Sequence, residues 1–348
     1  MFPLTFPLGI LSRRARKGDN VLDPFCGRGT TNFAARLVGL DSLGVDSSPV
    51  AVAITASKLV KTTVNDILVE AIKILAQYKA SYIPQGDFWQ AAFHPNVLDS
   101  LCRFREAFLK DCSTAARIGL RGILLGALHG PKQKCTNSYF SNQCPRTYAP
   151  KPAYAIRYWR DRGLIPDQID VLDLIERRAK RYYQALYKVT GNVHLADSRE
   201  ANALKLNSKV TGFNWVITSP PYYGMSTYIA DQWLRNWYVG GPDAVDYTNR
   251  NQLIHSSPKS FVDDLRKVWC NAASVCVDDA NMVIRFGGIS NRNVAPLDLI
   301  KGSLVDSGWR ITTIREAGTA DEGRRQADTF LRTNSKPLVE YDVYAVKC

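Results

Sequence analysis

Short apolar runs alternate with amphipathic segments in the first and last parts of the chain. The runs are rich in aliphatic and aromatic residues and stop at Asp, Gly, Ser or Pro, which is typical of buried strands. They predict strands at residues 20–23, 42–46, 192–195, 213–217, 281–286, 309–315 and 339–347. Helical spacing predicts helices at residues 6–11, 30–38, 50–59, 225–239, 261–277 and 296–307. Strands that alternate with helices favour an α/β fold with a doubly wound, mostly parallel sheet.

Residues 65–190 break this alternation, because they carry helical patterns without strands between them. Helices are predicted at residues 67–78, 97–109, 115–128, 154–160 and 167–189, around a loop at residues 130–152. The chain of 348 residues is therefore predicted to contain one α/β domain, made of residues 1–64 and 191–348. Residues 65–190 are predicted to be a helical insertion.

Positive charge is concentrated in this insertion. The whole chain carries a net charge of +13, and residues 101–190 hold 17 Lys and Arg against 7 Asp and Glu, an excess of ten. A localised basic block points to a polyanion such as nucleic acid, although a solvated helical surface is the alternative. The loop at residues 130–152 mixes cations, amides and aromatics, which suits phosphates and base edges. Its candidate DNA-binding cations are Lys132, Lys134, Arg146 and Lys151.

The stretch that organises the sequence is residues 213–224, where an apolar strand ends abruptly in a Ser-Pro-Pro-Tyr turn. Two prolines cannot continue a β-ladder, because neither has an amide proton. Ser219 supplies a hydroxyl and Pro220 a fixed carbonyl, and these two acceptors can hold both hydrogens of an exocyclic amine. Pro221 stiffens the turn, and Tyr222 offers a flat face for stacking a planar ring. The alternative is an ordinary proline-rich turn after a core strand.

A second motif begins where the first strand ends, at residues 23–30. Gly27 and Gly29 allow a tight turn and close approach to a ligand, and a helix is predicted from Thr30. Strand, glycine loop and helix together form the first unit of a nucleotide-binding sheet. Asp46, at the tip of the next strand, is placed to accept from both hydroxyls of a ribose, and Asp197 ends a third strand. For both acids the alternative is a helix cap.

Other features exclude several classes of protein. No apolar run approaches about 18 residues, so no transmembrane helix is expected. The start of the chain lacks a basic segment followed by an apolar core, so it is not read as a signal peptide. The eight cysteines include no Cys-x-x-Cys pair, and the spacing of Cys135, Cys144 and His129 matches no zinc pattern. We expect free thiols, no metal and a reducing, cytoplasmic location.

These motifs, in this order, resemble the S-adenosyl-L-methionine-dependent amino-methyltransferases of DNA. The resemblance covers most of the chain and implies a seven-stranded Rossmann-like methyltransferase sheet. It assigns the methionine-binding loop to Asp23, Pro24, Phe25, Gly27, Gly29 and Thr30. It also places Asp46 at the ribose, Asp197 at the adenine ring, and the catalytic motif at Ser219, Pro220, Pro221 and Tyr222. Asn214 departs from the pattern, since many relatives have an acid there.

The resemblance implies that a base is flipped out of double-stranded DNA and methylated directly on its exocyclic amine. Ser219 favours N4 of cytosine, whereas Asp or Asn at that position is commoner in enzymes that methylate N6 of adenine. N6 of adenine is the alternative, followed by RNA or protein amine methylation and by a non-catalytic nucleic-acid-binding module. No covalent cysteine adduct is needed, and Cys26 is expected to be a packing residue. The family also suggests a cognate restriction endonuclease as partner and a nucleoid-associated protein of a prokaryote.

Overall fold

The computed structural model describes residues 2–130, 138–142, 152–184, 189, 191–205, 212–224, 232–246, 253, 257–288, 294–319 and 339–348. The chain forms two compact units. The first comprises Met1–Thr55, Tyr187–Ser226 and Arg250–Cys348, and the second comprises Ala56–Leu186 and Thr227–Asn249. Helix α3 (Pro49–Leu59) runs from the first unit into the second.

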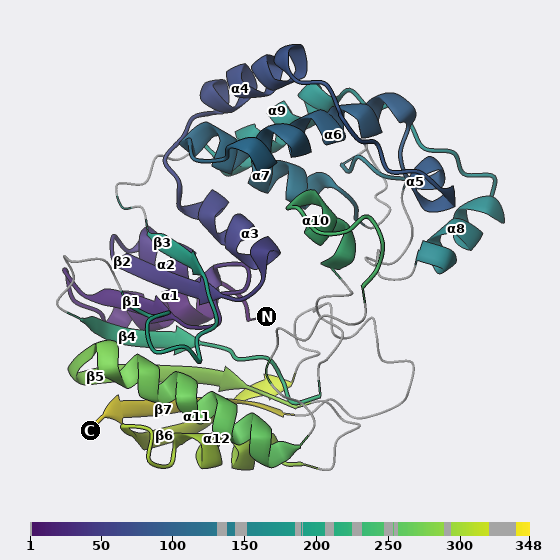
Figure 1. The fold of residues 1–348 in the computed structure, drawn as a ribbon. Helices are drawn as coiled ribbons and strands as arrows, with labels where there is room; N and C mark the ends of the chain where they lie inside the picture. Colours follow the sequence, from purple (N-terminus) through teal and green to yellow (C-terminus); the bar gives the residue numbers. More distant parts are fainter. Residues whose placement is uncertain are drawn as a thin grey trace. The chain divides into compact units, whose positions relative to one another are not determined.

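The first unit is built on a seven-stranded sheet with the order β3-β2-β1-β4-β5-β7-β6 (Figure 1). Its strands are β1 (Asn20–Asp23), β2 (Asp41–Asp46), β3 (Asn192–Leu195), β4 (Phe213–Thr218), β5 (Cys276–Phe286), β6 (Trp309–Thr319) and β7 (Val339–Lys347). Strands β1 to β5 pair in parallel, and β7 runs antiparallel to both of its neighbours. This is the mostly parallel Rossmann-like methyltransferase sheet that the sequence predicts.

The order of the strands reverses at β1. The chain moves outward in one direction from β1 to β2 and β3, and β4 then pairs with the other edge of β1. In open α/β sheets, ligands bind beyond the carboxyl ends of the strands at such a switch point. The loop after β1 and the turn after β4 therefore begin side by side at the place where this architecture puts its chemistry.

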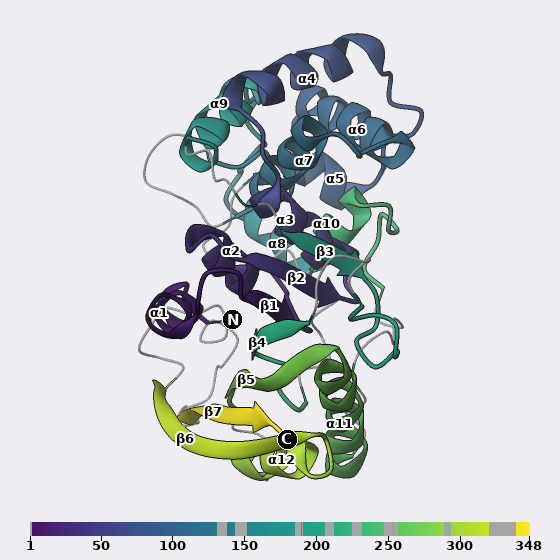
Figure 2. The same cartoon turned by 90° about the vertical axis from the view of Figure 1, so that its left-hand side faces the viewer.

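Both faces of the sheet are covered by helices of the first unit. Strand residues that alternate along the chain contribute to two different cores, as expected for side chains that point to opposite faces. Helices α11 (Pro258–Val275) and α12 (Pro296–Leu304) pack on one face through Trp269 and Ile300. Helices α1 (Thr5–Arg14) and α2 (Thr30–Leu37) pack on the other face (Figure 2), where Phe6, Ala34 and Trp215 belong to one hydrophobic core.

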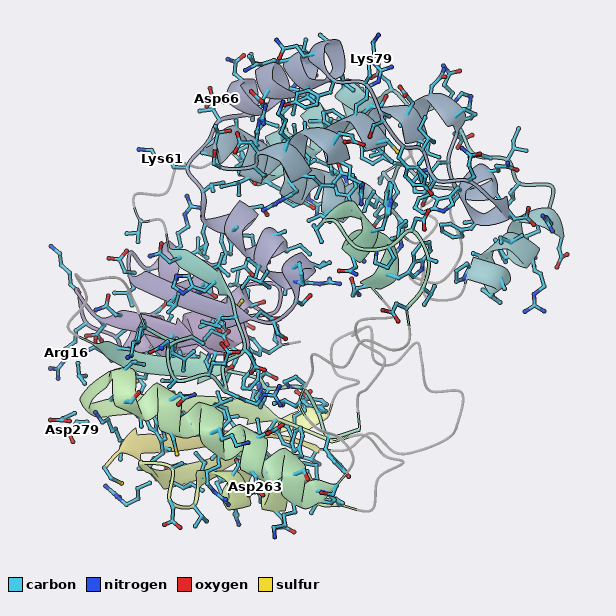
Figure 3. The ribbon with its side chains drawn as sticks, viewed as in Figure 1. Arg16, Lys61, Asp66, Lys79, Asp263 and Asp279 are labelled. Atoms are coloured by element: carbon cyan, nitrogen blue, oxygen red, sulfur yellow. The ribbon has the colours of Figure 1, made fainter. Side chains whose placement is uncertain are left out.

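The second unit is helical. It contains α4 (Val64–Gln77), α5 (Asp87–Ala92), α6 (Pro95–Lys110), α7 (Ala115–Ala127), α8 (Pro152–Arg160), α9 (Val171–Tyr182) and α10 (Trp233–Tyr238). Helix α4 begins with a capping box, in which Thr63 and Asp66 exchange hydrogen bonds. Asp66 is labelled at the start of this helix in Figure 3. Close approach of α7 and α3 requires Gly122, since a Cβ there would lie 2.1 Å from the Ser57 side chain.

An aromatic cluster explains why residues 227–249 belong to the helical unit, although the sequence placed them in the α/β domain. The ring of Trp237 lies 4.5 Å from that of Trp89, and the ring of Trp233 lies 4.9 Å from that of Phe88. The guanidinium of Arg105 also donates to the Trp237 carbonyl at 2.8 Å. These contacts join segments far apart in the sequence, so local patterns did not reveal them.

Most predicted elements are confirmed, and several boundaries differ. The helix expected at residues 167–189 is α9, which spans only Val171–Tyr182. Of the helix expected at residues 225–239, the structure has α10 (Trp233–Tyr238), and residues 225–231 lie outside the described ranges. The helix expected at residues 261–277 ends at Val275, and β5 begins at Cys276 rather than at residue 281. The sequence also missed α5, which has only 6 residues, too few to show a helical period. None of the helices in the described ranges is long and apolar enough to cross a lipid bilayer.

Candidate active site

The glycine loop after β1 is shaped by its own backbone. Gly29 has φ of 67° and donates to the Cys26 carbonyl at 2.7 Å, which closes the turn before α2 begins at Thr30. A side chain at Gly29 would meet Thr55 at 2.6 Å, so glycine is required there for packing as well as for conformation. Gly27 also has positive φ, at 51°, and it donates its amide proton to Asp46 at 2.9 Å. The loop is therefore held against the tip of β2.

Asp23 joins the two predicted motifs. Its carboxylate accepts from the Thr218 hydroxyl at 2.6 Å and from the Phe25 amide at 3.1 Å. On the same side of β4, the Thr31 hydroxyl donates to the Ile217 carbonyl at 3.0 Å. Asp23 is 1% exposed, and burial raises the pKa of its carboxyl to about 6 despite these hydrogen bonds. The glycine loop after β1 and the Ser-Pro-Pro-Tyr turn after β4 are thus fastened together through buried polar contacts.

Asp46 lies at the tip of β2 and is half-buried. One carboxylate oxygen accepts from Gly27, and the other accepts from the Ser48 amide at 2.9 Å. Burial raises the pKa of this carboxyl above its usual value. Ser48, rather than Asp46, caps α3, because its hydroxyl accepts from the Ala51 amide at 3.4 Å. A carboxylate oxygen has two lone pairs, so Asp46 can hold the loop and still accept from a ribose hydroxyl.

Asp197 follows β3 and is tied to a charged network. Both of its oxygens accept from the Arg199 guanidinium, the shortest contact being 2.6 Å, and Arg199 also reaches the buried Asp264 of α11 at 2.7 Å. The Arg199 hydrogen bond is the main influence lowering the pKa of Asp197, against the opposing effect of its partial burial. The neighbouring Ser198 hydroxyl donates to the Pro24 carbonyl at 2.6 Å. The segment after β3 is therefore fixed to the glycine loop, while the role of Asp197 at an adenine ring stays a prediction.

The turn after β4 places its four residues in different environments. Ser219 is half-buried, Pro220 is buried, Pro221 is exposed, and Tyr222 is half-buried. The ring of Tyr222 lies edge-on to Phe286 at 5.4 Å between centroids, and its hydroxyl donates to Glu340 of β7 at 2.6 Å. At the other end of β4, the amide oxygen of Asn214 accepts from the Asn20 amide at 2.9 Å, where many relatives would place an acid.

The thiol nearest the site is not suited to nucleophilic chemistry. Cys26 is 4% exposed and packs in the loop beside Gly44, where an added Cβ would lie 2.9 Å from the Cys26 Cβ. Burial raises the pKa of this thiol well above its ordinary value, so its thiolate is scarce near neutral pH. Among the described residues, no group of three or more His, Cys, Asp or Glu side chains is placed to hold a metal ion.

The predicted DNA-binding residues belong to the second unit. The candidate DNA-binding cations Lys132, Lys134, Arg146 and Lys151 lie outside the described residues. Within the described part of the second unit, Arg157 and Arg162 are exposed and form no ion pair, and the guanidinium of Arg162 lies 4.2 Å from the centre of the Tyr158 ring.

Several residues that build the site were not singled out from the sequence. Thr218 and Thr31 are ordinary strand and helix residues until the fold brings both to Asp23. Arg199 stands two positions after Asp197, and this acid–base spacing could have suggested a local ion pair. Glu340 gave no signal, because its partner Tyr222 lies 118 positions away in the sequence.

Comparison with known proteins finds a similarity to DNA methyltransferases in the first part of the chain. Residues 1–57 match the N6/N4 methyltransferase family model, which is described as DNA methylase. The Type II methyltransferase M.BsoBI of Geobacillus stearothermophilus is 50% identical over 34 residues, which are 10% of this chain and 7% of that protein. The family match confirms the predicted resemblance for residues 1–57, the segment from α1 into α3, and it supports S-adenosyl-L-methionine as the cofactor.

Solved structures that are similar to this chain include two methyltransferases. One is a SAM-dependent methyltransferase from Methanosarcina mazei, with a TM-score of 0.38 and 8% identity, covering 100% of this chain and 98% of that chain. Another is magnesium protoporphyrin IX methyltransferase from Synechocystis with bound SAM, with a TM-score of 0.36 and 10% identity, covering 99% and 78% of the two chains.

The buried carboxyl of Asp23 predicts a specific pH dependence of stability. Its pKa is about 6 in the folded chain, above the ordinary 3.8. Its contribution to stability is therefore complete below about pH 3.8 and is lost as the pH rises through about 6. Between about pH 5 and about pH 8, the wild type should lose on the order of 1–1.5 kcal/mol relative to Asp23→Asn. Urea unfolding of both proteins at the two pH values measures this difference.

The exposed Asp41, on the same sheet, provides the control for that measurement. The free energy of unfolding of Asp41→Asn should change by the same amount as that of the wild type between the two pH values. If the free energy of unfolding of Asp23→Asn also changes by the same amount as that of the wild type, Asp23 is not the titrating group.

Proposed function

We propose that this protein transfers a methyl group from S-adenosyl-L-methionine to the exocyclic amine of a base flipped out of double-stranded DNA, with N4 of cytosine as the preferred target. The observation that supports this most is the hydrogen bond between Asp23 and Thr218, at 2.6 Å. It fixes the Ser219 turn beside the glycine loop at the switch point of the sheet. A cofactor held by the loop and an amine held by the turn would then lie next to each other.

The residues present fit this cofactor. The half-buried carboxylate of Asp46 can accept from a ribose hydroxyl, and the turn at Gly27 and Gly29 brings backbone rather than side chains toward a ligand. Acidic groups on the strand tips also suit a ligand that carries positive charge. When bound, S-adenosyl-L-methionine supplies a methyl group on a sulfonium, an electrophile that an amine can attack directly.

The catalytic turn would prepare the amine for that attack. The Ser219 hydroxyl and the Pro220 carbonyl accept the two amino hydrogens and turn the nitrogen lone pair out of conjugation with the ring. Tyr222 supplies the surface on which the flipped base stacks. Fixed alignment of two reactants can contribute several kcal/mol to a rate, so a rigid Pro-Pro turn is well suited to this role. No step needs a cysteine, in keeping with the buried Cys26 thiol.

The helical unit is proposed to bind the DNA backbone. Its basic excess, the exposed Arg157 and Arg162, and the four loop cations all supply charge for phosphates. A cognate restriction endonuclease and association with a prokaryotic nucleoid are further parts of this proposal that rest on the family resemblance alone.

Asp46→Ala tests the cofactor site. The substitution should weaken S-adenosyl-L-methionine binding by on the order of 1–3 kcal/mol, because a charged hydrogen bond is lost and the Gly27 amide loses its acceptor. Isothermal calorimetry measures the affinity. The matched control is Asp41→Ala, an exposed acid at the opposite end of the same strand, which should bind as the wild type does. Unchanged affinity in Asp46→Ala would limit Asp46 to supporting the loop.

Substitutions in the turn test the chemical step. Ser219→Ala should slow methyl transfer while leaving cofactor affinity nearly intact, because the hydroxyl is proposed to face the base. Tyr222→Phe should keep substantial activity, whereas Tyr222→Ala should lose about one to two factors of ten, since stacking on an aromatic is worth roughly 1–3 kcal/mol per base.

Mass spectrometry of nucleosides from the product DNA identifies the modified base for these variants and for the wild type. N4-methylcytosine is expected. N6-methyladenine would keep the mechanism and change the target, whereas methylation at carbon 5 of cytosine would contradict it, because that reaction needs a nucleophilic thiol. Competition among duplex DNA, RNA and protein substrates tests the alternative amine methyltransferases, and a protein that binds DNA without transferring methyl groups would be a binding module.

Salt dependence tests the DNA surface. The logarithm of the binding constant should fall with the logarithm of salt concentration with a slope near −0.9 per phosphate neutralised. Replacing Lys132, Lys134, Arg146 and Lys151 by Gln together should flatten this slope. The control replaces Arg177 and Lys180 of α9, which form ion pairs with Asp173 at 2.8 Å and Glu176 at 2.7 Å and so should change the slope less. Equal slopes for the wild type and the loop variant would place the DNA surface elsewhere.

A further inference from the structure

A buried acid of β7 contacts the catalytic turn that follows β4. Glu340 is the second residue of β7, and its side chain is 3% exposed. Its Oε1 accepts from the Tyr222 hydroxyl at 2.6 Å, a length typical of a hydrogen bond to a charged oxygen. Burying a carboxylate is costly unless its hydrogen bonds are good, so the position of this acid needs an explanation.

The same strand register brings the Tyr222 ring against the sheet. Phe286 of β5 pairs with Tyr341 of β7, which sets Gly287 beside Glu340. An added Cβ at Gly287 would lie 2.9 Å from the Glu340 side chain and 3.4 Å from the Tyr222 ring. The ring also lies edge-on to Phe286, with an interplanar angle of 76°. Tyr222 is therefore held at its hydroxyl by Glu340 and along its body by the end of β5.

We propose that Glu340 is a positioning residue for the flipped base. By accepting from the hydroxyl of Tyr222, it fixes the plane of the ring on which the base stacks, and it thereby sets the direction in which the amine faces. The inference rests on the proposed function. A ring packed only at its body could still swing about its Cα–Cβ bond, whereas an acceptor oxygen at its hydroxyl restricts that motion and helps align the reactants.

A double-mutant cycle tests this role. The variants are Glu340→Ala, Tyr222→Phe and the double variant, assayed for kcat on duplex DNA that carries the sequence methylated by the wild type. Both single variants should lower kcat by about two- to threefold, so that Tyr222→Phe keeps substantial activity, with cofactor affinity within about twofold of the wild type. The double variant should be no slower than the slower single variant, because both changes remove the same hydrogen bond. Glu340→Gln keeps an acceptor oxygen and should recover most of the lost rate.

The control is Glu316→Ala on the neighbouring strand β6, an exposed acid whose register partner is Tyr341. It should leave kcat unchanged. If Glu340→Ala slows the enzyme equally in the Tyr222→Phe background, or if Glu340→Gln is as slow as Glu340→Ala, Glu340 does not act through the tyrosine hydroxyl. A parallel loss of cofactor binding would show a structural defect instead.

A separate observation tests the proposed function. It is contradicted if the wild type does not methylate an amine of duplex DNA. If the wild type methylates an amine in RNA or protein, the same cycle on that substrate decides the role of Glu340. A wild type that methylates none of these substrates overturns both proposals.

Discussion

A single buried hydrogen bond, between the Asp23 carboxylate and the Thr218 hydroxyl at 2.6 Å, sets the geometry on which the rest of the site depends. It crosses from β1 to β4, the pair of strands at which the order of the sheet reverses. Asp23 also holds the Phe25 amide, so the same carboxylate shapes the first residues of the glycine loop. Burial raises the pKa of this carboxyl to about 6, so its ionisation near neutral pH makes the folded chain less stable. This loss of stability accompanies the fixed placement of the glycine loop beside the turn after β4.

The strand tips bring acids close to one another, and the structure compensates them in different ways. Asp46 raises the pKa of Asp23 further through its negative charge, and it is itself satisfied by the backbone amides of Gly27 and Ser48. Asp197 is paired with Arg199, which also neutralises the buried Asp264. The edge near Asp23 and Asp46 therefore keeps its negative character, which favours a cationic ligand, while the edge near Asp197 does not.

The sequence predicted the parts of this site that local patterns encode. The ends of β1, β2 and β4 follow from apolar runs that stop at Asp or Pro, and the glycine loop follows from the backbone freedom that Gly29 needs. Contacts between residues far apart in the sequence could not be predicted from such local patterns. The early start of β5 depends on pairing with Phe213 of β4, and the aromatic contacts of Trp233 and Trp237 assign residues 227–249 to the helical unit. Glu340 reaches Tyr222 only because β7 inserts between β5 and β6.

The Ser-Pro-Pro-Tyr turn after β4 is fastened at both of its ends by carboxylates from different strands. Asp23 of β1 holds Thr218, just before the turn, and Glu340 of β7 holds Tyr222, its last residue. Between them, Pro220 and Pro221 remove backbone freedom without needing any further partner. A segment restrained in this way has little conformational entropy left to lose when a substrate arrives. In the proposed reaction, the binding energy of the base therefore contributes to orientation of its amine rather than to ordering of the turn, as direct transfer between two bound reactants requires.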